Sequence, residues 1–219
     1  MSESPRAIGV YGGTFNPVHL AHLRLAEEAC DALDLQEVRW IPAGNPPHRE
    51  APQVSAAQRL AMVRLATAGN PRFTVDAAEV EASASSYTIH TLLRLRAHYG
   101  PQQILVLLLG ADAAAGLATW HRWPELFAHA HLAIAERPGY TLTPETLPPA
   151  LAAEFAQRAA SATALRAAPA GCVVRFPLTP LGISATAIRK LIANGQSARY
   201  LLPTDVVDYI QAHSLYPPA

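Results

Sequence analysis

Two histidines in a glycine-containing run near the N-terminus have the residue types and spacing best suited to chemistry. The run reads Gly9-Val10-Tyr11-Gly12-Gly13-Thr14-Phe15-Asn16-Pro17-Val18-His19-Leu20-Ala21-His22. We expect a short apolar strand before the glycine pair and a helix that opens at about Val18. Imidazoles three positions apart share one face of a helical turn. Glycines let a backbone approach an anion without a Cβ in the way, and a helix N-terminus favours negative charge. The run therefore predicts a phosphate site.

Two alternatives stand beside this interpretation. The run could be a tight strand-to-helix turn whose histidines are polar surface residues. The histidines could also bind a metal ion, although nothing nearby in the sequence completes a set of three or four ligands.

Alternating strands and helices are expected to position this run. Hydrophobic patterning and breaker residues predict strands over 8–11, 37–41, 73–76, 104–109, 131–135 and 173–176. Helices are predicted over 18–33, 87–99, 149–168 and 204–213, with proline-containing loop over 43–54. Ser55 and Gln58 form a capping-box pattern that starts a further helix, and Ser184 is placed to cap another that ends at Gly195.

This alternation predicts an α/β fold with a Rossmann-like, doubly wound parallel sheet and helices on both faces. Such sheets bind ligands beyond the carboxyl ends of their strands. Candidate residues follow predicted strand ends at Gly12 and Gly13, at 42–49, at 110–112 and at Arg137. No linker separates two domains convincingly, so we expect one domain over 1–219.

The composition narrows the function classes. The 219 residues carry a formal net charge of zero, whereas proteins that bind duplex nucleic acid are usually basic. We therefore predict no nucleic-acid partner. Cys30 and Cys172 lie far apart and are expected to be free thiols in a reducing compartment. The longest apolar stretch, 104–109, is too short to span a bilayer, and no signal-peptide pattern occurs. We expect a cytoplasmic protein without a membrane partner, and the sequence leaves a homo-oligomer open.

Six motifs, in order from Gly9 to Arg189, resemble the nucleotidylyltransferase superfamily and most closely the bacterial nicotinate-nucleotide adenylyltransferases. The N-terminal run resembles that family's GGTFDPxHxGH, and Arg137-Pro138-Gly139 its RPG. The other four matches are PPHK at 46–49, SYTxDTL at 86–92, GADxxxxLxxW at 110–120 and ISSTxIR at 183–189. Departures from the family pattern are Asn16 for Asp, Ala21 for Gly, Arg49 for Lys, His90 for Asp and Ala185 for Ser.

The resemblance implies adenylyl transfer from ATP to nicotinate mononucleotide, giving nicotinate adenine dinucleotide and pyrophosphate in NAD biosynthesis. The family's reaction is a direct in-line attack by the mononucleotide phosphate and needs no protein nucleophile. Mg²⁺ is expected as the cofactor, carried mainly by the ATP phosphates and water, with no protein metal cage.

The resemblance also assigns roles to residues. His19, His22 and Arg189 are the implied catalytic residues, and the helical part at about 183–219 is implied to complete the nucleotide site. The implied ATP-binding residues are Gly12, Gly13, Thr14, Phe15, Gly110, Asp112, Ile183, Ser184 and Thr186. The implied mononucleotide-binding residues are His48, Arg49, Thr88, Trp120, His121 and Arg137, with Trp120 stacked on the pyridine ring.

Plainer roles remain open for several of these residues. Asp112 could cap the following helix, and Arg49 and Arg137 could be solvated surface charges. At least one of Trp120 and Trp123 is expected in the core. Competing functions are a sibling enzyme acting on nicotinamide mononucleotide, phosphopantetheine or a sugar- or glycerol-type phosphate, a non-catalytic nucleotide-binding module, and a zinc-dependent hydrolase.

Overall fold

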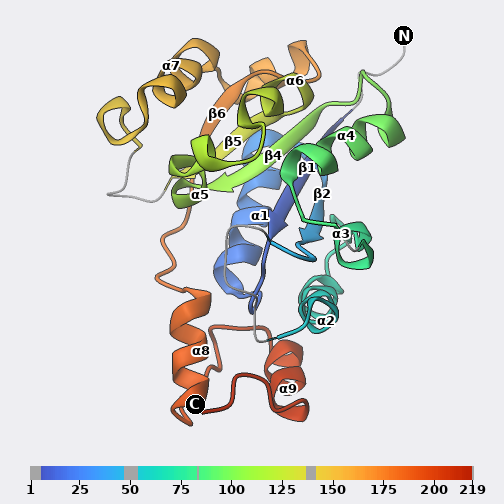
Figure 1. Ribbon diagram of the computed structural model, residues 1–219, viewed down its shortest axis with the longest axis vertical. Coiled ribbons are helices and arrows are strands. Elements are labelled where there is room, and N and C mark those ends of the chain that lie inside the picture. The colour runs from blue at the N-terminus through green and yellow to red at the C-terminus, as the bar shows by residue number, and fades with distance from the viewer. Residues whose placement is uncertain (1–5, 47–53, 83, 137–141, 219) are drawn as a thin grey trace. The chain divides into compact units, whose positions relative to one another are not determined.

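One sheet organises the chain in the computed structural model, which describes residues 6–46, 54–82, 84–136 and 142–218 (Figure 1). Its strands lie in the order β3-β2-β1-β4-β5-β6. They are β1 (Ala7–Gly13), β2 (Leu35–Pro42), β3 (Phe73–Val75), β4 (Leu105–Gly110), β5 (His131–Glu136) and β6 (Val173–Pro177). β1, β4, β5 and β6 pair in parallel. This is the doubly wound order, with the topological switch between β1 and β4, so the predicted fold class is confirmed.

The helices alternate with the strands much as the periodicity predicts. The longer ones are α1 (Leu20–Leu33), α2 (Ala56–Thr67), α4 (Thr88–Tyr99), α7 (Pro149–Arg158), α8 (Ala185–Ala193) and α9 (Thr204–Ala212). The short helices are α3 (Ala78–Glu81), α5 (Ala111–Ala115) and α6 (Leu126–His129). Within the described ranges, no helix has the length and apolarity that crossing a bilayer requires.

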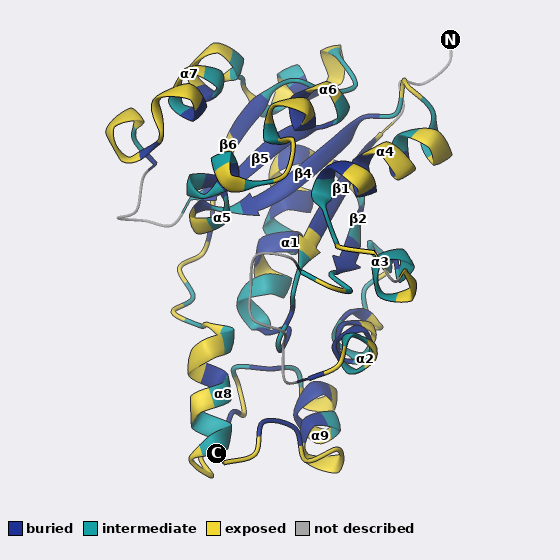
Figure 2. Cartoon of the chain, in the orientation of Figure 1, coloured by how far each residue is buried: buried dark blue, intermediate teal, exposed yellow. Residues whose placement is uncertain are grey.

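Contacts divide the chain into two compact units. The first comprises Met1–Tyr11, Leu25–Arg39 and Tyr87–Pro180, and the second Gly12–Arg24, Trp40–Ser86 and Leu181–Ala219. In the first unit, β4 and β5 form the buried centre, dark blue in Figure 2. Leu105 to Leu109 are at most 3% exposed, as expected of a continuous apolar strand that is covered on both faces.

Local chemistry fixes two helix starts of the second unit, those of α2 and α8. The Ser55 hydroxyl accepts from Gln58 N at 3.2 Å while Ser55 N donates to Gln58 Oε1 at 3.1 Å, which confirms the capping box. Ser184 caps α8 by accepting from Ala187 N at 3.2 Å.

An aromatic cluster lies in the core of the second unit. Trp40 is fully buried, and its ring packs against the rings of Phe15 and Phe73, with ring centroids 5.3 and 5.4 Å away.

One helix prediction was wrong in its length. The alanine-rich segment was expected to be helical over 149–168, but α7 ends at Arg158. The next residues leave the helix to pair with the edge strand, because Ala160 N donates to Val173 O at 2.9 Å. A bridge also joins Ala159 to Val173. A tertiary backbone pairing therefore outweighs the strong helix propensity of alanine here.

Candidate active site

The turn after β1 is made by a phenylalanine rather than by a glycine. Phe15 has a left-handed backbone with φ 47°, whereas neither Gly12 nor Gly13 has a positive φ. A Cβ added at Gly13 would lie 3.0 Å from the Phe15 ring, so this glycine makes room for its own neighbour. Phe15 is 3% exposed, and its ring meets His22 edge-on with centroids 5.2 Å apart. We call residues 12–16 the corner; in it Gly12 is exposed and Thr14 half-buried.

The two histidines of the run lie together, as their spacing predicts. Their rings stack with centroids 3.6 Å apart and an interplanar angle of 22°. His22 Nδ1 accepts a hydrogen bond from His19 N at 3.1 Å. A nitrogen that accepts carries no proton, so this bond puts the proton of a neutral His22 on Nε2. His19 is 5% exposed and His22 half-buried, which contradicts the alternative that both are surface residues.

Groups of the chain itself bind several amides at the start of α1. His19 N donates to His22 Nδ1, and Leu20 N donates to Leu201 O at 3.0 Å. His22 N donates to His19 O at 2.9 Å. We therefore expect the imidazole pair, more than these helix-start amides, to contact an anion near α1.

Arg189 ties α8 to the corner. Its Nη1 donates to Asn16 O at 2.8 Å and its Nη2 to the Thr186 hydroxyl at 3.3 Å. Ser184 and Thr186 are exposed at the start of α8, and Ile183 is half-buried just before them. The structure thus brings together the predicted residues of the second unit: the corner, the imidazole pair and the start of α8 with Arg189.

A buried arginine that the sequence reasoning missed also holds the corner. Arg59 on α2 is 1% exposed, and it donates to Thr14 O at 2.7 Å and to Gly44 O at 3.0 Å. Desolvation by burial lowers its pKa, and a coulombic interaction with Tyr216 acts in the opposite direction. In the sequence, this residue stands in an apolar helical run and carries no motif that would have identified it.

Ser86, the first residue of the SYT motif, fixes the backbone of Gly44 and Asn45. Its hydroxyl accepts from Gly44 N at 2.9 Å and from Asn45 N at 3.2 Å, while Ser86 N donates to Asn45 O at 3.0 Å. The motif match marked this position, but the bonding role became visible only in the structure.

The first unit holds a separate group of predicted residues, around the start of α4. Thr88 is the first residue of α4, and Tyr87 precedes it. The Tyr87 ring lies 4.5 Å from that of His121 and 5.5 Å from that of His90 (centroid distances). The His90 and His121 centroids are 5.8 Å apart. His90, which departs from the family pattern, therefore belongs to the same aromatic cluster as the predicted His121.

Two of the plainer alternatives can be checked. Gly110 is the residue before α5, and no side chain caps that helix, so Asp112 is not its cap; it is exposed in the first turn. The expectation that Trp120 or Trp123 lies in the core was wrong, because both are half-buried. His48, Arg49 and Arg137 lie outside the described residues, so their surroundings are not assigned.

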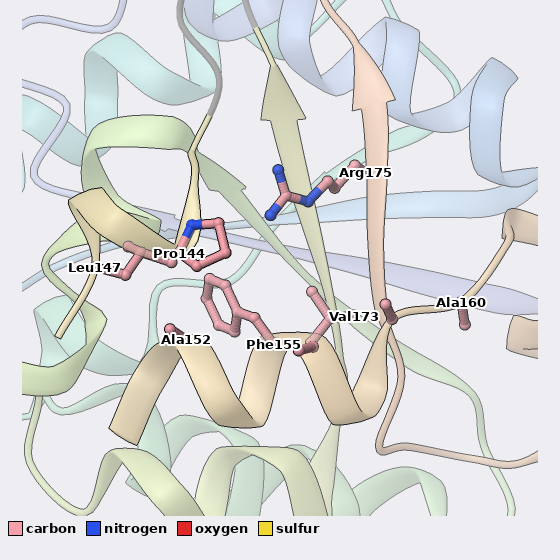
Figure 3. A pocket seen from close by; sticks show the side chains of 9 residues that line it. Pro144, Leu147, Ala152, Phe155, Ala160, Val173 and Arg175 are labelled. Atoms are coloured by element: carbon pink, nitrogen blue, oxygen red, sulfur yellow. The ribbon is translucent and has the colours of Figure 1, made fainter. Parts of the chain in front are cut away.

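A hollow of about 230 Å³ lies between α7 and the edge strand β6 (Figure 3). Apolar side chains such as Phe155 and Val173 line it, together with Arg175. The Arg175 guanidinium donates to Glu136 Oε1 at 2.6 Å and to Leu142 O at 2.9 Å. None of the predicted site residues lines this hollow, and we assign it no ligand.

Comparison with known proteins identifies the family. Residues 10–191 match the cytidylyltransferase-like family model. A probable nicotinate-nucleotide adenylyltransferase of Dechloromonas aromatica (strain RCB) is 62% identical over 210 residues, covering 95% of this chain and 97% of that protein. A probable nicotinate-nucleotide adenylyltransferase of Laribacter hongkongensis (strain HLHK9) is 49% identical over 217 residues, covering 99% and 97%.

The fold also matches a solved structure. That structure is the Plasmodium falciparum nicotinic acid mononucleotide adenylyltransferase complexed with NaAD, with a TM-score of 0.71, 15% identity, and coverage of 96% of this chain and 97% of that chain. The chain therefore belongs to the cytidylyltransferase-like family and, within it, to the nicotinate-nucleotide adenylyltransferases.

Proposed function

We infer that this protein transfers the adenylyl group of ATP to nicotinate mononucleotide, forming nicotinate adenine dinucleotide and releasing pyrophosphate in NAD biosynthesis. Membership of the family supports this function through relatives that are 62% and 49% identical over nearly the whole chain. The structural observation that carries it is the stacked imidazole pair at the corner, with the His22 proton on Nε2.

The chemistry suits such a site. An oxygen of the mononucleotide phosphate attacks the α-phosphorus of ATP in line, and the bond from that phosphorus to the bridging oxygen breaks as pyrophosphate leaves. No protein nucleophile takes part, so the residues act by orienting the phosphates and stabilising their charge. One well-placed donor of this kind is worth about 2.7–4 kcal/mol. His19, His22 and Arg189 are proposed for this role.

The other predicted residues are proposed to bind the two substrates. Thr14 orients a phosphate oxygen, and the start of α8 at Ser184 and Thr186 binds the outgoing phosphates. Asp112 holds ribose hydroxyls. Thr88 and His121 are proposed to receive the nicotinate carboxylate through their backbone, beside the pyridine ring stacked on Trp120. Residues 183–219 complete the nucleotide site in this proposal, within a single catalytic domain.

Mg²⁺ is proposed as the counter-ion that ATP brings with it. When bound to the phosphates, it neutralises part of their charge, and it keeps several water ligands in doing so. Location in the cytoplasm and assembly into a homo-oligomer stay predictions from the sequence.

Pyrophosphate release tests this function directly. The purified protein is supplied with ATP and Mg²⁺, and with nicotinate mononucleotide or nicotinamide mononucleotide as acceptor. We expect rapid release with the acid and little with the amide. Equal rates would contradict the proposed recognition of the carboxylate, and no release with either acceptor would contradict the function itself.

His22→Ala tests the imidazole pair. We expect turnover to fall about 100- to 1,000-fold, with little change in the affinity for nicotinate mononucleotide. His98→Ala, which removes an exposed imidazole from α4, is the matched control and should keep its turnover. Turnover of His22→Ala near that of the control would remove His22 from the mechanism.

A further inference from the structure

A tyrosine close to the C-terminus has its side chain buried. After α9 the chain turns back, with Leu215 N donating to Ile210 O at 3.0 Å. Tyr216 has a left-handed backbone with φ 59° and is 3% exposed. This conformation is uncommon for a residue with a Cβ. Tyr200 has a similar backbone, with φ 66°, but its side chain is 88% exposed, so the burial of Tyr216 needs its own explanation.

The contact that explains this placement is a hydrogen bond to the corner. The Tyr216 hydroxyl donates to Asn16 Oδ1 at 2.7 Å. Arg189 Nη1 donates to the main-chain oxygen of the same asparagine at 2.8 Å. Asn16 is therefore held twice, once by its side chain and once by its backbone, from two different C-terminal segments.

Burial of the phenol keeps it protonated, and therefore a donor. Burial raises the pKa of Tyr216 far above its usual range, while Arg189 and Arg59 act in the opposite direction. The hydroxyl is therefore protonated at neutral pH and donates to the amide oxygen. Asn16, which stands where the family pattern has Asp, is a neutral acceptor for this neutral donor.

Asn16 lies where its position can matter for the reaction. It lies two residues after Thr14, whose main-chain oxygen accepts a hydrogen bond from Arg59, and three residues before His19. A shift of Asn16 would move the backbone that leads into the imidazole pair. Misplacement of reacting groups by about 1 Å can cost 100-fold in rate.

We propose that Tyr216 is a positioning residue for the ATP-binding corner and acts through its hydrogen bond to Asn16. This proposal rests on the proposed function, because it assigns the corner to ATP. Tyr216 touches no reacting atom in this scheme; it fixes where the corner and the histidines stand.

Tyr216→Phe tests the proposal because it removes only the hydroxyl and leaves the ring in place. We expect kcat/KM for ATP to fall about 10-fold, KM for nicotinate mononucleotide to stay within twofold, and the thermal midpoint to lie only about 2–4 °C below that of the control, which corresponds to one hydrogen bond. Tyr209→Phe is that control, since it makes the same change on α9, where the half-buried Tyr209 ring stacks on His213. A lower thermal midpoint with unchanged kinetic constants would make Tyr216 merely structural and overturn the proposal.

A double-mutant cycle tests whether the effect passes through Asn16. In an Asn16→Ala background the hydroxyl has lost its acceptor, so adding Tyr216→Phe should change kcat/KM for ATP by less than twofold. If the fold-changes in kcat/KM caused by the two single substitutions instead multiply in the double mutant, Tyr216 does not act through Asn16, and the proposal is overturned.

Hydrogen exchange separates a failure of this proposal from a failure of the proposed function. Amides in peptides covering residues 12–22 should exchange faster in Tyr216→Phe than in wild type, with no change in Tyr209→Phe. If wild type releases no pyrophosphate, the function fails, and exchange still reports on the corner. Equal exchange in Tyr216→Phe and wild type would overturn the positioning role.

Discussion

Replacing Arg59 by methionine should destabilise the protein through the loss of two hydrogen bonds. The side chain is 1% exposed and donates to Thr14 O at 2.7 Å and Gly44 O at 3.0 Å. A hydrogen bond from a charged donor contributes about 1.5–3 kcal/mol, so the two together contribute about 3–6 kcal/mol. Removing the guanidinium also relieves its cost of burial, which is what lowers its pKa. We expect a net loss of about 2–4 kcal/mol in the free energy of unfolding.

Calorimetry or circular dichroism can measure this loss as a shift in the thermal midpoint. For a chain of this size, 1 kcal/mol corresponds to about 2–4 °C, so the midpoint of Arg59→Met should fall by about 4–16 °C. Arg59→Lys keeps the charge, but one ammonium cannot reproduce the fork that reaches both carbonyls, and it should lose about half as much.

The matched control is Arg64→Met, an exposed arginine on the same helix. It should stay within about 0.5 kcal/mol of wild type. A midpoint for Arg59→Met equal to that of the control would refute the reasoning, because the hydrogen bonds would then do no more than offset the cost of burying the charge.

Three further substitutions test the supports of the site and the pH dependence of stability. Ser86→Ala leaves the amides of Gly44 and Asn45 without their acceptor, so we expect urea denaturation to show a loss of about 1–2 kcal/mol, with the exposed Ser85→Ala unchanged. In Gly44→Ala the new Cβ would collide with the main-chain oxygen of Glu79, which should lower the free energy of unfolding in urea by about 1–3 kcal/mol. In the control, Gly69→Ala, the new Cβ meets no atom within 4 Å, so its stability should equal or exceed that of wild type. His131 is fully buried, and desolvation lowers its pKa more than its backbone hydrogen bonds raise it. In the unfolded chain, the His131 imidazole takes up a proton near pH 6.5, whereas in the folded protein it stays neutral at that pH. The free energy of unfolding therefore falls as pH drops below that value. The thermal midpoint of His131→Asn should depend less on pH between 7.5 and 5, and an unchanged slope would show that His131 does not cause the acid sensitivity.

Local chemistry made much of the fold predictable from the sequence. The capping box at Ser55 and Gln58 needs only residues that are neighbours in the chain, and the cap at Ser184 likewise. The continuous apolar run of β4 signalled a strand buried on both faces, as found. The end of α7 could not be predicted in this way, because it depends on Val173, which is distant in sequence from the start of that helix.

The same distinction applies to the site. Spacing and glycine content predicted that His19 and His22 lie together, and the structure stacks them. Nothing local marked Arg59, since a single arginine in an apolar helix normally reads as a surface charge. Tyr216 had no motif or spacing signal either, because its partner lies at the other end of the sequence.

The distance along the chain between Asn16 and its partners has a consequence for the order of folding. Asn16 accepts hydrogen bonds from Arg189 and Tyr216, which lie 173 and 200 positions later in the sequence. The residues that pair between β4 and β5 are only about 25 positions apart. Closing a longer loop costs more chain entropy, and contacts of high sequence separation slow folding. We therefore expect refolding protein to regain its helices and its β4–β5 pairing before its corner is assembled, so that enzymatic activity returns after secondary structure.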